Sequence, residues 1–334
     1  MILAGDIGGT KTELAIFDSH DSQMRGPKFE RRYLNREQDN LPAMVQNFLR
    51  DAGLSITDAC FAVAGPVRAG RCVMPNLPWV VDGLELQQAL GLTRVALIND
   101  LEATAYGITT LSPEEFAVIN QGVEDVNGNA ALIAAGTGLG EAIMFRVKDG
   151  FHISATEGGH TDFAAQNDEE AGLFRFLYNK YDCHVSYERV VSGPGLADIY
   201  DYFLSCNDIA ESENLREYIK EAPDRSAAIT ELSLAGKSKI CAATLDLFIR
   251  VYGAEASNLA LKTLATGGIY IGGGIAPKIL PKLQDGRFFQ AFCAKGRFSG
   301  LVADIPVKVI LNEKTALRGA AAFVFKAKET NNKK

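Results

Sequence analysis

The sequence predicts an α/β protein of two lobes, and three observations support this prediction. The chain has 334 residues, which at roughly 150 residues per domain corresponds to about two domains. Apolar stretches with the period of strands alternate with stretches of helical period, an order typical of parallel strands joined by helical crossovers. An apolar strand, a Gly/Thr turn and a second strand begin at Ile2 and again at Ala131, which indicates two lobes built on one plan.

Strand and helix signals follow one another closely in the first third of the chain. A helical repeat of apolar residues stops at Gly53, and Asp82 starts a capping-box-like pattern that opens the next helix. The expected strands are residues 2–4, 13–17, 60–64 and 95–98, and the expected helices are residues 41–52, 83–91 and 101–108.

The rest of the chain begins with the same strand, turn and strand order and then becomes rich in helices. The last expected helix has an apolar face and no obvious partner nearby, so it could pack on either lobe. The expected strands are residues 131–135, 142–147, 269–271 and 306–311, and the expected helices are residues 169–181, 194–204, 226–234, 239–264 and 315–327.

Composition and charge exclude several classes of protein. A net charge of −7 argues against nucleic acid or an anionic membrane as a partner. No uncharged stretch is longer than residues 263–277, and these are too few to span a membrane. The scattered cysteines form no C-x-x-C pair, and the N-terminus has no basic leader, so we expect reduced thiols and a cytoplasmic location.

Two glycine-rich turns are candidates for binding phosphate. Residues 5–12 approach the pattern of a P-loop, but Thr10 stands before Lys11 where that loop requires glycine, and a short apolar run follows instead of a helix. Residues 136–140 lack the third glycine of the dinucleotide fingerprint and also lead into a strand. We interpret both as hairpin turns whose N–H groups form an anion nest, with hydroxyl donors from Thr10 and Thr137.

For either turn alone, the ordinary preference of hairpins for glycine is the better explanation. Further glycines at 193–195 and 272–274, each before an expected helix, shift the interpretation towards a phosphate-bearing ligand held between the lobes. Asp6 is the one acid in the first turn, and magnesium prefers such a mixture of carboxylate, water and phosphate oxygens. The alternative for Asp6 is a side chain that only shapes the turn.

Polar residues at two other places suggest a site for a polyhydroxylated substrate. Asp100 follows an expected strand, where ligands collect in open α/β sheets, although Asn99 or Asp100 could simply cap the next helix. In Glu157-Gly158-Gly159-His160 the glycines let the acid and the histidine face one point, but a loop hydrogen-bond network would explain them equally well. Glu188 alone predicts no more than a surface ion pair.

Together these motifs resemble those of the bacterial glucokinases, which belong to the superfamily of hexokinase, actin and the heat-shock chaperones. The resemblance runs nearly end to end. It rests on residues 5–10, 98–100, 136–140, 157–163, 188–190, 192–196 and 272–275 with Pro277.

The resemblance implies two ribonuclease-H-like lobes, each a mixed sheet flanked by helices, with a cleft between them for sugar and nucleotide. The small lobe is expected at residues 1–110 plus 313–334, because the last helix crosses back to it, and the large lobe at 111–312. A homodimer is a further expectation from the family.

The resemblance also implies an activity and a role for each motif. The activity is ATP-dependent phosphorylation of the 6-hydroxyl of glucose to glucose 6-phosphate, with Mg²⁺ and with Asp100 as general base. The residues that would hydrogen-bond glucose are Asn99, Asp100, Glu157, His160 and Glu188. The residues that would contact phosphate or nucleoside are Gly5, Asp6, Ile7, Gly8, Gly9, Thr10, Gly136, Thr137, Gly138, Gly193, Gly273 and Gly274, with Asp6 near Mg²⁺ through water.

Two departures and two alternatives accompany this prediction. Lys11 stands where these glucokinases commonly have Asn, which leaves phosphate contacts at the first turn open. The related repressor and sugar-kinase family often has Lys there, but its cysteine-rich zinc motif is missing, since only Cys183 follows His160 closely. The alternatives are a kinase for another hexose or using ADP or polyphosphate, and a non-catalytic sugar-sensing protein.

Overall fold

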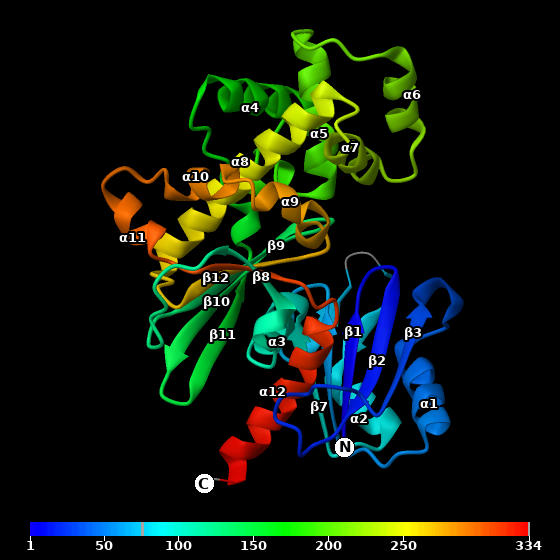
Figure 1. Cartoon of the computed structure of the whole chain (residues 1–334). Helices are drawn as coiled ribbons and strands as arrows, with labels where there is room; N and C mark the ends of the chain where they lie inside the picture. Colours follow the sequence, from blue (N-terminus) through cyan, green and yellow to red (C-terminus); the bar gives the residue numbers. More distant parts are fainter. Residues whose placement is uncertain (75–76, 333–334) are drawn as a thin grey trace. The chain divides into compact units, whose positions relative to one another are not determined.

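A computed structural model describes residues 1–74 and 77–332, and the chain falls into two compact units (Figure 1). Unit 1 contains Met1–Glu115, Ile153–Ala155 and Asn312–Lys334, and unit 2 contains Phe116–His152 and Thr156–Leu311. The expected α/β class, with mixed sheets flanked by helices, is confirmed. The expected limits of the two lobes stay a prediction. Residues 333–334, the end of the expected small lobe, lie outside the described residues.

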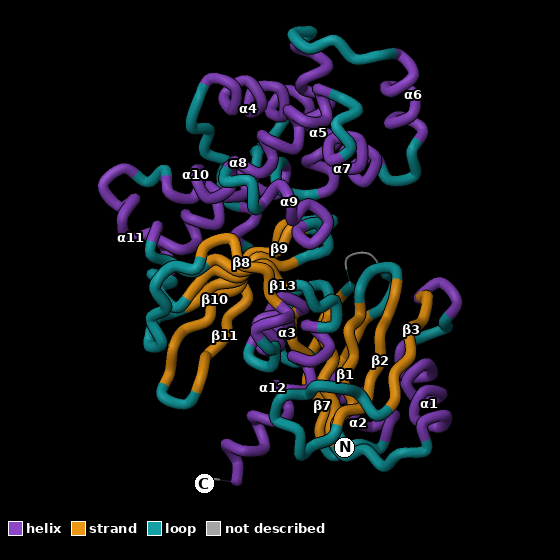
Figure 2. Tube along the Cα trace, in the orientation of Figure 1, coloured by secondary structure: helices purple, strands orange, loops and turns teal. Residues whose placement is uncertain are grey.

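Unit 1 is built on a five-stranded sheet in the order β3-β2-β1-β4-β7 (Figure 2). Its strands are β1 (Ile2–Ile7), β2 (Lys11–Phe17), β3 (Phe29–Leu34), β4 (Asp58–Val63) and β7 (Arg94–Asn99), and β5 (Arg71–Val73) and β6 (Val80–Asp82) form a separate pair. β2 pairs antiparallel with β1 and with β3, whereas β1, β4 and β7 run parallel. The carboxyl ends of the three parallel strands therefore meet at one edge, where ligands bind in open α/β sheets.

The two faces of this sheet bury different side chains because successive strand residues point to opposite sides. Leu3 belongs to one core together with Phe48, and Ile2 belongs to another together with Leu317. The helices of unit 1 are α1 (Leu41–Ala52), α2 (Gly83–Leu90), α3 (Asp100–Ile108) and α12 (Thr315–Asn332). The sequence did not show where the last helix packs. In the structure α12 packs on β1, β4 and α3, and so covers the face of the sheet that carries Ile2.

Two glycines let α3 and α12 approach each other closely. A Cβ atom at Gly319 would lie 1.7 Å from the carbonyl oxygen of Ala103, and one at Gly107 would lie 2.0 Å from that of Thr315. Any side chain at either position would push the two helices apart.

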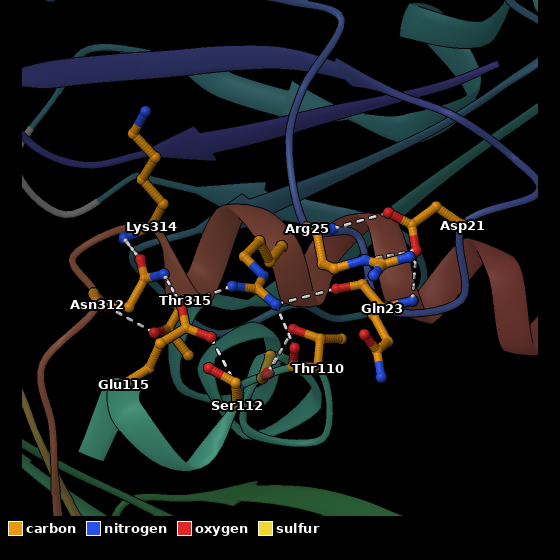
Figure 3. A network of polar contacts seen from close by, with 11 residues as sticks. Asp21, Gln23, Arg25, Thr110, Ser112, Glu115, Asn312, Lys314 and Thr315 are labelled. Atoms are coloured by element: carbon orange, nitrogen blue, oxygen red, sulfur yellow. Dashed lines mark hydrogen bonds and ion pairs between the residues drawn. The ribbon is translucent and has the colours of Figure 1, made fainter.

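Polar side chains join Glu115, the last residue of the N-terminal stretch of unit 1, to Asn312, the first residue of its C-terminal stretch (Figure 3). The Glu115 carboxylate accepts hydrogen bonds from Asn312 Nδ2 and, over 2.7 Å, from Arg318 Nη1. Arg318 is 5% exposed, and its Nη2 also donates to the carbonyl oxygens of Gln23 and Thr110. The buried guanidinium thus joins the first turn of α12 to residues 23, 110 and 115 of unit 1.

Unit 2 has a six-stranded sheet in the order β11-β10-β9-β12-β13-β8 (Figure 2). The strands of this sheet are β8 (Phe116–Asn120), β9 (Ala130–Ala135), β10 (Leu139–Val147), β11 (Gly150–Thr156), β12 (Gly268–Gly272) and β13 (Val307–Ile310). Three residues of β11, Ile153–Ala155, are grouped with unit 1. The helices of unit 2 are α4 (Asp168–Tyr181), α5 (Gly193–Cys206), α6 (Glu213–Glu221), α7 (Arg225–Leu234), α8 (Lys239–Thr263), α9 (Leu280–Leu283), α10 (Arg287–Cys293) and α11 (Ser299–Ala303). The long helix α8 packs against β9 and β12 and against α5, α7 and α10, so it forms the centre of this unit.

One predicted helix differs in the structure. A helix was expected after residues 272–274, and the structure has a 3₁₀ turn, Ala276–Ile279, followed by the four-residue helix α9. Pro277 and Pro281 explain the difference, because proline has no N–H for the helical hydrogen bond. Throughout the part of the chain that the structure describes, no helix combines the length and apolar character needed to cross a bilayer.

Candidate active site

The first glycine turn joins β1 to β2 at the carboxyl edge of the unit 1 sheet. Gly8 N donates a hydrogen bond of 3.0 Å to the carbonyl oxygen of Lys11, which closes the hairpin. Lys11 begins a strand and not a helix, so a P-loop is excluded. Gly8, Gly9 and Thr10 all have some exposure to solvent, and their N–H groups and the Thr10 hydroxyl are the donors of this turn.

Two other residues predicted for this turn lie in the core instead. A Cβ atom at Gly5 would lie 2.4 Å from Cδ1 of Phe61, so packing alone requires glycine there. The side chain of Ile7 is fully buried in the core of the sheet. Both residues shape the strand that leads to the turn.

Asn35, which the sequence did not indicate, holds this turn from the end of β3. Its side chain is 3% exposed. Its Nδ2 donates to the carbonyl oxygen of Gly8 over 2.9 Å, its Oδ1 accepts from the hydroxyl of Thr12 over 2.8 Å, and its N–H donates to the carbonyl oxygen of Thr10 over 2.9 Å. The bonds to Gly8 and Thr10 fix the backbone on both sides of Gly9, and the bond from Thr12 fixes the orientation of the Asn35 amide.

Asp6 lies beside other acidic groups. Burial of its carboxyl group, together with the negative charges of Asp100 and Glu13, raises the pKa of Asp6 to about 7, and Lys11 offsets part of this rise. Its surroundings therefore disfavour the ionised form near neutral pH, and a cation bound next to Asp6 would reverse that preference.

Asn99 and Asp100 lie where β7 ends and α3 begins. Asn99 is the N-cap of α3, since its Oδ1 accepts from Leu101 N over 2.9 Å, and its Nδ2 donates to the carbonyl oxygen of Gly65 over 3.2 Å. Asp100 is the first residue of the helix, and its Oδ1 also accepts from Leu101 N over 2.9 Å. The cap is therefore Asn99, and the Asp100 carboxylate lies at the positive end of the helix dipole.

Glu157, His160 and Glu188 come together in unit 2. His160 Nε2 lies 4.0 Å from a carboxylate oxygen of Glu157, and His160 Nδ1 lies 3.8 Å from one of Glu188. The side chains of Glu157 and His160 are 75% and 59% exposed, and that of Glu188 is 31% exposed. Two carboxylates around an imidazole offer acceptors and a donor, as the hydroxyl groups of a sugar require.

The second glycine turn lies against Glu188. Gly136 N donates to the carbonyl oxygen of Gly138, and Gly193 N donates to that of Gly136, both over 2.8 Å. Leu139 N donates to Glu188 Oε2 over 2.9 Å, and a Cβ atom at Gly138 would lie 2.4 Å from the same oxygen. The turn leads into β10, so a dinucleotide fingerprint is excluded, and it joins Glu188 to the first turn of α5.

A pocket of about 950 Å³ opens beside this turn within unit 2. This volume lies within the range of pockets that bind small molecules, about 300–1,000 Å³. Four residues predicted for nucleotide contacts line it: Gly136, Thr137, Gly193 and Gly274. Gly273 does not line it. With φ of +82° and only 2.2 Å between a Cβ atom there and the carbonyl oxygen of Ala135, Gly273 is required by the backbone.

The wall of this pocket around the start of α7 was not predicted from the sequence. Asp224 is the N-cap of α7 and accepts from the hydroxyl of Ser226 over 2.6 Å and from Ala227 N over 3.0 Å. These hydrogen bonds, with Lys278 nearby, hold the pKa of Asp224 below its usual value. Asp224, Ser226 and Lys278 all line the pocket, so they add polar groups to walls that are partly apolar.

A metal site made by protein side chains alone is absent among residues 1–74 and 77–332. No group of three or more His, Cys, Asp or Glu residues there could hold an ion. A metal ion at Asp6 would need further ligands from a bound molecule or from water.

Comparisons with known proteins identify the family of this chain. A model of the glucokinase family matches residues 3–327. A glucokinase of Nostoc punctiforme is 40% identical over 333 residues, which cover 96% of this chain and 98% of the relative. The crystal structure of a glucokinase from an Antarctic psychrotroph has a TM-score of 0.85 at 33% identity and covers 97% of this chain and 98% of its own.

The fold also extends to more distant sugar kinases. The ROK family glucokinase of Streptomyces griseus, solved in complex with glucose and AMPPNP, has a TM-score of 0.64 at 19% identity and covers 96% of this chain and 98% of its own. The family match over residues 3–327 and the 40% identity to a full-length relative decide the assignment. This chain belongs to the glucokinase family.

Proposed function

We propose that this protein transfers the γ-phosphoryl group of ATP to the 6-hydroxyl of glucose, with Asp100 as general base and glucose 6-phosphate as product. The observation that supports the proposal most strongly is the place of Asp100, at the N-terminus of α3 and at the carboxyl edge of the parallel strands, in a chain of the glucokinase family. A carboxylate there can accept a proton from a bound hydroxyl group.

Glucose is proposed to bind through Asn99, Asp100, Glu157, His160 and Glu188. The hydrogen bonds of Asn99 with Leu101 and Gly65 fix its side chain and leave the second hydrogen of Nδ2 for a sugar oxygen. Glu188 uses Oε2 to accept from Leu139 N, so its Oε1 remains for a sugar hydroxyl. Side chains held in this way lose little freedom when the sugar binds.

In the reaction, the 6-hydroxyl oxygen of glucose attacks the γ-phosphorus of ATP, and its proton passes to Asp100. The bond between the γ-phosphorus and the bridging oxygen breaks, and ADP leaves. Positioning and stabilisation of charge supply most of the catalysis in such transfers. The donors for the phosphate oxygens are proposed to be the N–H and hydroxyl groups of Gly8, Gly9 and Thr10 and of Gly136, Thr137 and Gly138, and the pocket beside Gly193 and Gly274 is proposed to hold the nucleoside.

Magnesium is proposed to accompany ATP and to contact Asp6 through water. The carboxyl group of Asp6 fits this role, because burial and neighbouring carboxylates raise its pKa to about 7 and a divalent cation would favour its ionised form. When bound, magnesium neutralises charge on the phosphate oxygens. A homodimer and a cytoplasmic location also belong to this proposal.

The experiment that tests the function measures sugar phosphate formation over a panel of hexoses with ATP, ADP or polyphosphate as donor. We expect the highest kcat/KM for glucose with ATP. A higher kcat/KM for another hexose or donor would replace the substrate assignment. Binding of glucose without turnover for any pair would instead support the sugar-sensing alternative.

Replacing Glu157 with Ala is expected to raise the KM for glucose roughly ten- to hundredfold, because a hydrogen bond to a charged group contributes about 1.5–3 kcal/mol. The value of kcat should change much less. Glu217→Ala, at an exposed position of α6, is the matched control and should keep the KM of the wild type. An unchanged KM in Glu157→Ala would remove Glu157 from the sugar site.

A further inference from the structure

Two glutamates that the proposed reaction does not use are buried next to the sugar-contacting residues. Glu141 lies on β10 and is 2% exposed, and Glu255 lies on α8 and is fully buried. The charge of Glu255 raises the pKa of Glu141, so their carboxyl groups are close neighbours. Acidic side chains are almost never fully buried unless they are paired, so this contact calls for a physical explanation.

The hydrogen-bond partners of the pair indicate that it holds one proton. Within the described part of the chain, neither Glu141 Oε1 nor Glu255 Oε1 has a hydrogen-bond donor, and the nearest cation of Glu255 Oε1 is Lys262 Nζ at 3.5 Å. Two neighbouring buried carboxylates cannot both ionise without a large cost, whereas one shared proton supplies a donor between them.

Several titratable groups surround the two glutamates, and among those with a shifted pKa, Glu141 has the value nearest to neutral pH. Burial and the Glu255 carboxylate raise the pKa of Glu141 to about 8, and Lys262 offsets part of this rise. Lys295 also faces Glu255, and burial lowers its pKa. Burial and Glu255 raise the pKa of Tyr187 to about 12, and burial with Glu141 raises that of Tyr252 as well. With one proton, the pair keeps a single negative charge beside Lys262 and Lys295.

One side of the pair supports the loop that carries Glu157 and His160. A Cβ atom at Gly158 would lie 1.9 Å from Glu141 Oε2, so this oxygen rests against the backbone of the loop. The carbonyl oxygen of Glu141 accepts from the hydroxyl of Thr156 over 3.3 Å, and that hydroxyl accepts from Gly158 N over 3.1 Å. A movement of the Glu141 side chain would therefore move Gly158, between the two sugar-contacting residues.

The other side of the pair supports Glu188. Asn258 Nδ2 donates to Glu255 Oε2 over 2.8 Å and to the hydroxyl of Tyr187 over 3.0 Å, which uses both of its hydrogens. Lys295 Nζ donates to Asn258 Oδ1 over 2.6 Å and holds the amide in this orientation. Tyr187 immediately precedes Glu188. A change in the protonation of the two glutamates would therefore also move Glu188, the third sugar-contacting residue.

We propose that Glu141 and Glu255 share one proton and act as positioning residues, which hold Glu157, His160 and Glu188 in the geometry that binds glucose. This inference rests on the proposed function. When the shared proton is lost, two like charges repel each other against Gly158 and beside Asn258, and the affinity for glucose falls.

The test compares the KM for glucose and kcat of the wild type, Glu141→Gln and Glu170→Gln between about pH 7 and about pH 9. In the wild type we expect KM to rise by up to about tenfold over this range, because the fraction of protonated pairs falls to about one tenth. Gln carries an N–H donor where the acid carries its proton, so Glu141→Gln should match the wild type at about pH 7 and stay flat to about pH 9. Glu170→Gln changes a buried glutamate at the start of α4 and should follow the wild type.

A second measurement needs no variant and keeps the test valid if Glu141→Gln fails to fold. Glucose binding to the wild type at about pH 8, measured by calorimetry in two buffers of different ionisation enthalpy, should be accompanied by proton uptake. Two results would overturn this inference without affecting the proposed function. One is a wild type with no proton uptake and a pH-independent KM, and the other is an equal rise of KM with pH in Glu141→Gln. A wild type that neither binds nor phosphorylates glucose at any pH would contradict the proposed function instead.

Discussion

Asp100→Asn is expected to lower kcat for glucose by about 10²–10⁴-fold, the range that a positioned general base contributes. Asn has nearly the shape of Asp and can still accept from Leu101 N, as Asp100 Oδ1 does over 2.9 Å. It cannot take up the proton of the sugar hydroxyl. The dissociation constant for glucose should therefore stay within about threefold of the wild type, since one hydrogen bond changes and the remaining contacts do not.

Steady-state kinetics and calorimetric titration with glucose check both parts of this result. The matched control is Asp82→Asn, because Asp82 also begins a helix and accepts from Leu84 N over 2.9 Å and from Glu85 N over 3.2 Å. Asn is an equally good N-cap, so this control should keep both kcat and the dissociation constant. A kcat like that of the wild type in Asp100→Asn would refute the assignment of the base.

Arg318→Met is expected to lower the free energy of unfolding of unit 1 by about 3–5 kcal/mol, the usual cost of removing one partner of a buried ion pair. The variant leaves the Glu115 carboxylate without its 2.7 Å partner and removes the donor from the carbonyl oxygens of Gln23 and Thr110. Met fills much of the same volume, so lost polar contacts and not a cavity would dominate the change.

Urea unfolding followed by tryptophan fluorescence measures this effect selectively. Trp79 is the one tryptophan of the chain and lies in unit 1, so the signal follows that unit even if the units unfold separately. The matched control is Arg25→Met, in the same region of Figure 3. Arg25 is 75% exposed and pairs with Asp21 over 3.7 Å, so its removal should change stability by less than about 1 kcal/mol. Equal effects of the two variants would show that the buried network adds little.

Much of the fold could be predicted because local signals and tertiary packing agree. The helix predicted over residues 41–52 is α1, and Gly53 and Gly91 end their helices with φ of 61° and 64°, where glycine is favoured. Three of the strands that were missed, β3, β8 and β11, lie at sheet edges. β3 lacks the apolar pattern on which the predictions depended, because it is partly exposed and reads Phe-Glu-Arg-Arg-Tyr-Leu.

The candidate site divides in the same way. The glycine turns and the Asn99-Asp100 pair carry their chemistry in adjacent residues, so the sequence could indicate them. Asn35 and the glutamates at 141 and 255 act on residues that are distant in the chain, and nothing near them in the sequence marks that contact. Only the pairing of strands and the packing of α8 bring these groups to the turns and loops that they hold.

The place of α12 has a consequence for synthesis on the ribosome. β1 and β4 are made before unit 2, whereas Leu317 and its neighbours, which cover Ile2 and Cys60, are made after it. About 200 residues of unit 2 lie between, and at roughly 5–20 residues per second their translation takes on the order of 10–40 s. During this time the apolar face of the first sheet is available to chaperones, while unit 2 can already complete its core. The part of the protein that emerges first is thus the last to finish folding, and a nascent chain released before α12 would remain a chaperone client.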